Sequence, residues 1–174
     1  MLDDVHQEML MESYFGQLYR MKCILFSAQL VHQLLLRMMV TKKQNEIWFS
    51  IGGKPTRFSL YEFPLITGLR ASEEPSLEPH IVTNDRLVKK HFKKCKKGIT
   101  VYNLKEAIES CKVRMEDKYK IGLVNILETV LLPKESYTYI NLEHLSMVDD
   151  LDAFNSYPWG RKTFGHTIDV FTRD

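Results

Sequence analysis

The sequence predicts a mainly α-helical protein with one small β-hairpin, an α+β fold built as a compact bundle of about six or seven helices. Apolar residues recur at helical spacing over most of the 174 residues. One short stretch alternates in the manner of strands around a pair of glycines. Hydrophobic residues make up 44% and charged residues 26% of the chain, which is ordinary for a globular protein. We therefore expect a single domain over residues 1–174, because a chain of this length buries about 70% of its unfolded surface.

The first strong helix is expected from Ser27, as its N-cap, through Val40, with apolar residues along one face. The spacing of the apolar residues then changes from a helical to an alternating pattern. Residues 46–51 and 56–58 flank the sequence Gly-Gly-Lys-Pro at residues 52–55, a pattern that favours a hairpin with a glycine-containing loop.

The next helix has the clearest start and stop signals in the chain. Ser59 and Glu62 have the spacing of a capping box, in which each residue satisfies a free backbone amide. Pro64 is expected to kink or shorten this helix before Gly68 ends it. Arg57 precedes Phe58 in this motif, and we expect it to form a buried or half-buried ion pair with Glu62.

Five further helices are predicted downstream from caps and breakers. They are a basic helix capped near Thr83 and stopped by Gly98, a helix over residues 104–112 behind an Asn103–Glu106 capping pair, a helix over residues 118–132 ended by Pro133, a helix capped by Asn141 that reaches about Phe154, and a last helix beginning within residues 157–161. Pro158 is expected near the first turn of the last helix, with Trp159 packed inward and followed by Gly160.

The formal net charge of +2 conceals a strongly polarised chain. Residues 86–120 contain twelve Lys and Arg against four Asp and Glu, whereas residues 1–19 contain four acids and no base. The candidate nucleic-acid-binding residues in the basic helix are Arg86, Lys89, Lys90, Lys93, Lys94, Lys96 and Lys97. Such a patch can neutralise DNA or RNA phosphates or serve as a nuclear import signal. The alternative is a solvated helix face, as most charge runs are.

Several motifs occur in one order along the chain. They are residues 32–37 (HQLLLR), 46–53 (EIWFSIGG), 57–69 (RFSLYEFPLITGL), 117–120 (DKYK), 130–133 (VLLP) and 157–161 (YPWGR). This series resembles the plant domain-of-unknown-function family nineteen-eighty-five over about residues 15–171. The resemblance implies a piece of a transposon-derived plant protein in a nuclear setting, often fused upstream of a cysteine protease domain that cleaves SUMO-like modifiers. It implies no catalytic residue, and we expect this chain to stop before that C-terminal domain.

Protease chemistry within the chain is not expected. A cysteine nucleophile needs a histidine base and an orienting group, yet Cys111 lacks the SUMO-protease sequence context and Cys23 precedes five of the six histidines. An odd number of unpaired cysteines and an acidic N-terminus favour an intracellular protein.

Neither a metal nor a cofactor is expected. His91 and Cys95 share a helix face, but two further ligands would have to come from afar, so packing at the edge of the core is favoured. The pair of glycines at residues 52–53 lacks the context of a phosphate-binding loop. The aromatic residues Trp48, Phe49, Phe58 and Phe63 could stack on bases, but core packing is favoured for them too.

The sequence thus favours a non-catalytic accessory module that contacts nucleic acid electrostatically through its basic helix. Lysines without interleaved arginines or exposed aromatic residues indicate phosphate contact over base reading. The alternative is a protein-binding adaptor, with a SUMO-pathway or transposase partner and no nucleic-acid contact. A membrane partner is not expected, because polar residues interrupt the longest apolar run. The structural role of a scaffold motif falls to Arg57, Ser59, Glu62, Gly68, Pro158, Trp159 and Gly160.

Overall fold

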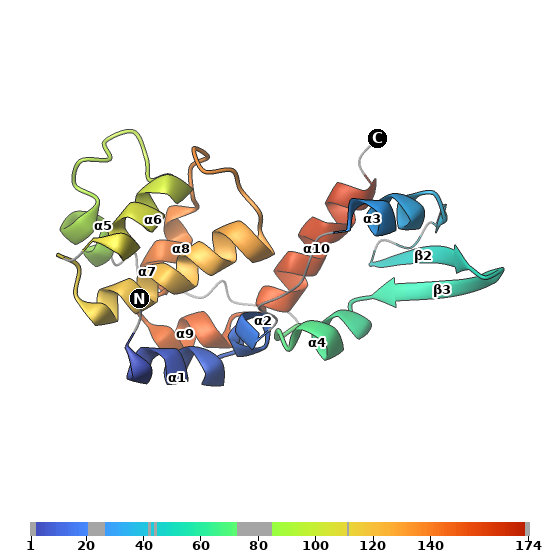
Figure 1. Ribbon diagram of the computed structural model, residues 1–174, viewed down its shortest axis with the longest axis horizontal. Coiled ribbons are helices and arrows are strands. Elements are labelled where there is room, and N and C mark those ends of the chain that lie inside the picture. Colours follow the sequence, from blue (N-terminus) through green and yellow to red (C-terminus); the bar gives the residue numbers. More distant parts are fainter. Residues whose placement is uncertain are drawn as a thin grey trace. The chain divides into compact units, whose positions relative to one another are not determined.

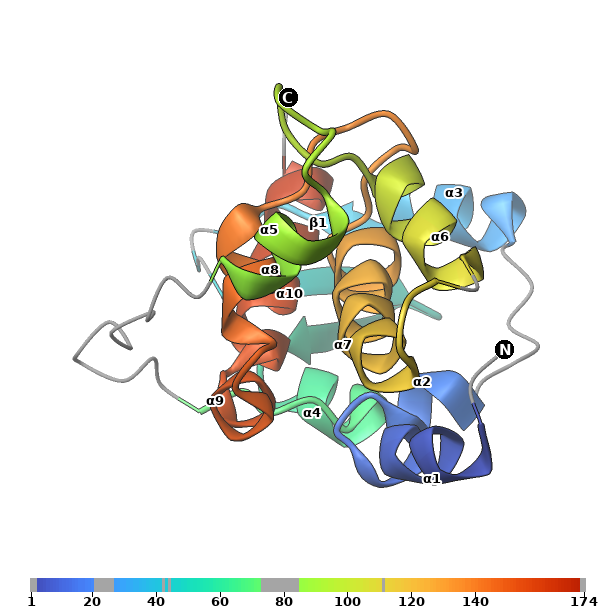
Figure 2. The ribbon, with the colours of Figure 1, turned by 90° about the vertical axis from the view of Figure 1, so that its left-hand side faces the viewer.

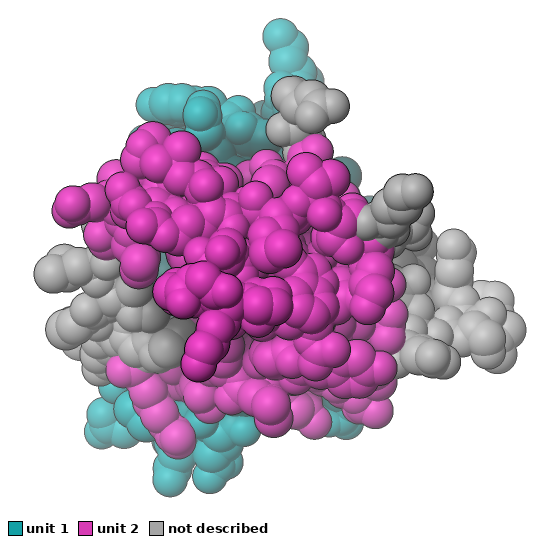
Figure 3. Space-filling model, turned by 90° about the vertical axis from the view of Figure 1, so that its right-hand side faces the viewer, with its two compact units in different colours: residues 1–13, 74–157 teal, residues 14–73, 158–174 magenta. Residues whose placement is uncertain are grey.

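The computed structural model describes residues 3–20, 27–41, 43, 45–72, 85–110 and 112–172. It confirms a mainly α fold with a small antiparallel sheet (Figure 1). The described residues form ten α-helices and one π-helical segment, more than the six or seven helices predicted. They form two compact units: residues 1–13 with 74–157 (unit 1), and residues 14–73 with 158–174 (unit 2) (Figure 3). The assignment of the whole chain to one domain stays a prediction.

The regular elements described in unit 1 are all helices. Its elements are α1 (Asp4–Glu12), α5 (Arg86–His91), α6 (Val101–Glu109), α7 (Met115–Ile126), the π-helical segment η1 (Leu127–Leu131), α8 (Leu142–Met147) and α9 (Leu151–Ser156). The core of the unit is mainly aliphatic, and most of its side chains come from α7, α8 and the elements next to them. The most deeply buried are Leu87, Leu104, Ile121, Leu123, Val124, Leu127, Leu145, Val148 and Phe154.

Unit 2 combines the sheet with four helices. Its elements are α2 (Gly16–Arg20), α3 (Ala28–Leu35), β1 (Met38–Met39), β2 (Glu46–Ile51), β3 (Lys54–Ser59), α4 (Glu62–Thr67) and α10 (Trp159–Thr172). The rings of Phe58, Phe63 and Phe164 lie with centroids 5.5–6.2 Å apart, which joins β3, α4 and α10 in one aromatic cluster. Phe49 and Trp159 are also buried. Core packing is therefore confirmed for these aromatic side chains.

The hairpin is tighter than predicted. Gly52 and Gly53 alone form the turn, with φ of 58° and 74°, as a two-residue type I′ connection requires. The predicted four-residue loop is wrong, because Lys54 pairs with Ile51 and Pro55 pairs with Ser50. Pro55 is tolerated there because β3 is an edge strand in the order β1-β2-β3.

Helix α3 begins as predicted but ends early. The Ser27 hydroxyl accepts a hydrogen bond from the Leu30 amide, so the predicted N-cap is confirmed. The helix stops at Leu35 instead of Val40, because the sheet competes for the following residues. The Arg37 carbonyl accepts from the Ser50 amide at 2.8 Å, and residues 38–39 pair with β2. No described residue of α3 is buried.

Helix α4 corrects the interpretation of Pro64. Because the helix starts at Glu62, Pro64 lies in its first turn, where the missing N–H would have had no intrahelical partner. No kink is needed. The Glu62 carboxylate accepts from the Ser59 amide at 2.8 Å, as in a capping box, but the Ser59 hydroxyl accepts from Tyr61. Gly68 ends the helix in the left-handed conformation, with φ of 73°, as predicted.

Three boundaries in unit 1 also differ from the prediction. Thr100 and Asn103 form the capping box of α6, in place of the predicted Asn103–Glu106 pair, because the helix already starts at Val101. Helix α7 starts three residues before the predicted Lys118 and continues into η1. Asn141 caps α8 as predicted, but this helix ends at Met147. A second cap by Asp150 starts α9, because the Asp150 carboxylate accepts from two amides of the new first turn.

Among the helical glycines of the described residues, Gly160 leaves the least space for a side chain. Its amide donates to the Arg70 carbonyl at 2.7 Å, and a Cβ built on it would lie 2.7 Å from that oxygen and 2.9 Å from the Leu69 carbonyl. Backbone cannot move aside as a flexible side chain can. By contrast, a Cβ on Gly165 in the same helix would meet nothing within 4 Å.

We therefore expect Gly160→Ala to lower the free energy of unfolding by about 1–3 kcal/mol through overpacking. Gly165→Ala is the matched control and should raise it by about 0.4–1 kcal/mol, because alanine favours the helix. Urea unfolding followed by circular dichroism measures both. Equal effects of the two variants would contradict the close approach of Arg70 to α10.

Candidate nucleic-acid interface

The basic segment is a short helix followed by a series of turns. Helix α5 covers Arg86–His91, and the backbone leaves the helical region at Phe92, whose ring is buried. Hydrogen bonds from the amides of Cys95 and Gly98 to carbonyls three residues earlier shape the turns that follow. The prediction of one helix up to Gly98 is therefore wrong. The predicted cap at Thr83 lies outside the described residues.

Arg86 is committed to two buried carboxylates. Its Nη1 donates to Asp117 at 2.9 Å, and its Nε and Nη2 donate to Asp149 at 3.1 and 2.5 Å. These partners come from α7 and from the turn before α9. The carboxylates hold the pKa of Arg86 above its usual range, through the hydrogen bonds to Asp149 first. Arg86 thus cross-links three segments that are far apart in the sequence.

Asp117 collects two further cationic or protonatable partners from α5. It accepts from the Lys90 ammonium at 2.5 Å and lies 2.8 Å from His91 Nε2. The Asp117 residue is only 2% exposed. Burial alone would raise the pKa of its carboxyl group, but the hydrogen bonds from Lys90, His91 and Arg86 outweigh burial and hold the pKa well below its usual range. The side chains of Arg86, Lys90, His91, Asp117, Lys120 and Asp149 form what we call the buried charge network.

The remaining lysines of the candidate set have side chains that are exposed to solvent. Lys89 is mostly exposed and lies 3.7 Å from Asp85 on the next turn of the helix, a weak surface pair. The lysine turn, as we call it, consists of Lys93, Lys94, Lys96 and Lys97. All four are exposed, and none forms an ion pair with a residue in the described part of the chain.

A surface cavity of about 670 Å³ lies beside the lysine turn. Its lining includes Lys93, Lys94, Cys95, Asn103, Ser110 and Lys112. The lining also includes the acid Glu106 and the apolar side chains of Phe92 and Val113, so the cavity is mixed in character with an excess of basic residues. His91, considered in the sequence as a metal ligand with Cys95, lies against Asp117 in the buried charge network. Among the residues that the structure describes, no three His, Cys, Asp or Glu side chains are placed to hold a metal ion. Cys23 and Cys111 lie outside that part.

A second buried carboxylate organises the chain between η1 and α8. Glu128 is fully buried; its Oε1 lies 2.7 Å from His144 Nδ1 and accepts from the Asn141 amide at 3.0 Å. Lys134 Nζ lies 2.8 Å from the other carboxylate oxygen. Burial would raise the pKa of Glu128, but these partners, His144 foremost, lower it. Glu128 therefore anchors both ends of segment 133–141 to the core, through Lys134 and Asn141.

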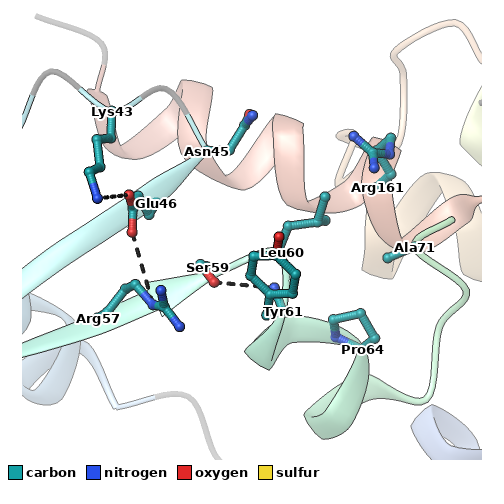
Figure 4. A pocket seen from close by; sticks show the side chains of 10 residues that line it. All are labelled: Lys43, Asn45, Glu46, Arg57, Ser59, Leu60, Tyr61, Pro64, Ala71 and Arg161. Carbon is teal, nitrogen blue, oxygen red and sulfur yellow. Dashed lines mark hydrogen bonds and ion pairs between the residues drawn. The ribbon is translucent and has the colours of Figure 1, made fainter. Parts of the chain in front are cut away.

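Unit 2 contains a separate polar cavity of about 630 Å³, shown in Figure 4. Arg57, which lines this cavity, forms the predicted ion pair with Glu62 at 2.8 Å; the pair is not buried, because the two side chains are 43% and 33% exposed. A hydrogen bond from Ser59, then the one from Arg57, lowers the pKa of Glu62 to about 2. Glu46 lies between Lys43 at 2.9 Å and Arg57 at 3.9 Å, so acids compensate most of the positive charge there.

Sequence reasoning found the basic residues but missed their acidic partners. Asp117 and Asp149 lie 31 and 63 residues from Arg86, and no local pattern links residues at such separations. One signal was available. Arg86 and Lys90 are four residues apart, so they share a helix face that a buried acid can bridge.

Comparison with known proteins places the chain in a family. The family described as Domain of unknown function (DUF1985) matches residues 35–170. The chain belongs to this family. The match includes α5, the lysine turn and both carboxylates of the buried charge network. No curated protein sequence and no solved structure matches the chain.

The description of the DUF1985 family names no catalytic activity. None of the helices in the described ranges is long and apolar enough to cross a lipid bilayer.

We expect Asp117→Asn to lower the free energy of unfolding of this DUF1985 domain by about 2–3 kcal/mol. The substitution leaves three cationic or protonatable groups facing one another, although partial exposure of Arg86 and Lys90 moderates the cost. Asp85→Asn is the matched control, because it removes an exposed carboxylate beside Lys89, and should change stability by less than about 0.5 kcal/mol. Urea unfolding measures both, and equal losses would contradict the role of the network.

The same carboxylate gives a pH dependence with a defined sign. Because the pKa of Asp117 is lower in the folded protein than its ordinary value of 3.8, its contribution is complete above about pH 4 and declines as the pH falls below that value. Wild type should lose more unfolding free energy than Asp117→Asn between pH 5 and roughly pH 2. Parallel curves would show that Asp117 gains no partners on folding.

Proposed function

We propose that this DUF1985 domain is a non-catalytic interaction module that contacts the phosphates of DNA or RNA through its lysine turn. One observation carries the proposal: four lysines lie within five residues, exposed to solvent and without an acidic partner in the described ranges. Each lysine that meets a phosphate releases condensed counterions, which is the main source of sequence-independent affinity. Lysine binds phosphate as a point charge and so makes contacts that tolerate any sequence.

The buried charge network separates the candidate residues that have a structural role from those that are proposed to contact phosphate. Its carboxylates compensate Arg86 and Lys90, so we assign these two of the seven candidate residues to holding α5 in place. Lys89 and the lysine turn then provide the contact with phosphate. Because α5 leads directly into the turn, a fixed α5 also fixes the point at which the lysine-bearing turn begins. A preorganised cluster loses less entropy on binding than a loose chain does.

We further propose a nuclear protein of a plant mobile element as the setting, in which this domain works beside a separate SUMO-protease-like domain. The ordered motifs of the sequence support this. The module would bring such a protease to nucleic acid. A fluorescent fusion of the full-length protein that is excluded from nuclei would contradict the nuclear setting.

The alternative function is a protein-binding adaptor without nucleic-acid contact, with a SUMO-pathway or transposase partner. Its support is the surface of α4, where Tyr61, Leu65 and Ile66 are all exposed on one short segment. An apolar cluster of this kind is typical of a protein-binding surface. Titration of purified SUMO against the domain tests the first partner, and a Leu65→Ser variant that binds as wild type would contradict the use of this surface.

The main test is fluorescence anisotropy of labelled single- and double-stranded DNA, titrated with salt. Lys94→Gln should reduce the slope of log affinity against log salt by roughly 0.7–0.9, the value for one lost phosphate contact. Lys54→Gln is the matched control, an exposed lysine on the hairpin of unit 2, and should leave the slope unchanged. Replacement of all four lysines of the turn by glutamine should abolish binding at physiological salt.

Two outcomes would contradict the proposal. One is absence of binding at low salt by a folded protein. The other is binding that Lys54→Gln and Lys94→Gln weaken equally, because this would indicate general attraction by the whole surface.

A further inference from the structure

Three exposed tyrosines lie in unit 1 on segments that adjoin the lysine turn. Tyr102, Tyr137 and Tyr139 are 49%, 81% and 53% exposed. Tyr102 is in the first turn of α6, and the other two precede α8. We call these three residues the tyrosine strip. Large aromatic side chains are seldom left this exposed in a group without a binding role.

Backbone pairing fixes the strip against the residues that follow the lysine turn. Tyr139 forms an antiparallel bridge with Thr100, and the Ile140 amide donates to the Ile99 carbonyl at 2.9 Å. On the other side, the Tyr102 amide donates to the Ser136 carbonyl at 2.7 Å. Residues 136–140 therefore run alongside residues 98–102. The loops that follow α5 and precede α8 lie on the same side of unit 1 in Figures 1 and 2.

Side-chain contacts join the strip to the turn more closely still. A Cβ on Gly98 would lie 2.7 Å from the ring of Tyr139, so this ring packs on the backbone one residue after Lys97. The rings of Tyr102 and Tyr137 are stacked, with centroids 5.9 Å apart and an angle of 25° between their planes. The buried carboxylate of Glu128 holds Lys134 and Asn141, at the two ends of this segment. The strip is thus both exposed and anchored.

We propose that the lysine turn and the tyrosine strip together form a binding surface for single-stranded nucleic acid. Unpaired bases stack on the tyrosine rings, and the lysines neutralise the phosphates between them. This combination of a cationic track and aromatic faces is how proteins hold single strands without reading their sequence. A duplex cannot use the strip, because its bases are already stacked inside the helix. The inference rests on the proposed phosphate contact and adds to it the preference for unpaired bases.

The sequence prediction lacked this feature, since it assumed that the basic segment had no exposed aromatic residues nearby. The tyrosines belong to segments about 5 and 40 residues farther along the chain. Their neighbourhood depends on the pairing of residues 98–102 with residues 136–140.

The test compares the binding of an oligothymidylate of about 12 nucleotides, a length within the usual site sizes, with that of a duplex of the same length. We expect tighter binding of the single strand. Tyr137→Ala should weaken that binding about 5- to 100-fold, the loss that follows removal of one stacked base. It should leave duplex binding unchanged. Tyr137→Phe keeps the ring and should bind as wild type. Tyr61→Ala, an exposed tyrosine in unit 2, is the matched control and should also bind as wild type.

An abasic strand of the same length separates the two hypotheses, because it keeps the phosphates and lacks the bases. Weak, salt-dependent binding of the abasic strand that Tyr137→Ala leaves unchanged is expected. Equal affinities for the abasic strand, the single strand and the duplex would overturn the stacking surface while phosphate contact stands. Absence of binding to all three would overturn both proposals. Circular dichroism of Tyr137→Ala confirms that the variant is folded.

Discussion

The carboxylate of Asp117 is the constraint on which the arrangement of unit 1 depends. It is buried on α7, and a buried charge without partners would cost several kcal/mol. Its partners are three side chains of α5, among them Arg86, which extends the network to Asp149 before α9. A helix of only six residues has little stability of its own. Helix α5 therefore depends on the side chains that tie it to α7 and on the burial of Leu87.

This constraint also divides the basic residues between structure and function. The charges of α5 that point inward are compensated, whereas those of the turn after it face solvent without partners. A single run of basic residues in the sequence thus acquires two roles, because Arg86 and Lys90 lie on α5 beside the buried carboxylates and the later lysines lie in the turns after the helix ends. A second buried carboxylate, Glu128, anchors the segment before α8, as Asp117 anchors α5. The two anchored segments carry the lysine turn and the tyrosine strip.

Unit 2 is stabilised by different means. Aromatic packing among β3, α4 and α10 replaces the buried charges of unit 1. Local hydrogen bonds then set the course of the backbone, with Glu62 reaching back to Ser59 and α10 starting against the Arg70 carbonyl. Ser59, Glu62 and Gly160, which make these contacts, belong to the predicted scaffold motif, whose role stays a prediction. The exposed apolar residues of α4 lie outside this framework, and this is why they support a protein partner as the alternative.

The sequence by itself determined the features that depend on neighbours within five residues. It predicted the caps at Ser27 and Asn141, the left-handed glycine at the end of α4 and the ion pair of Arg57 with Glu62, because each needs only local backbone geometry and one nearby side chain. Only the tertiary structure decided where α3 and α5 end, which lysines remain unpaired and which tyrosines adjoin them. Those outcomes depend on sheet pairing and on partners that lie tens of residues away, and local patterns carry no information about such contacts.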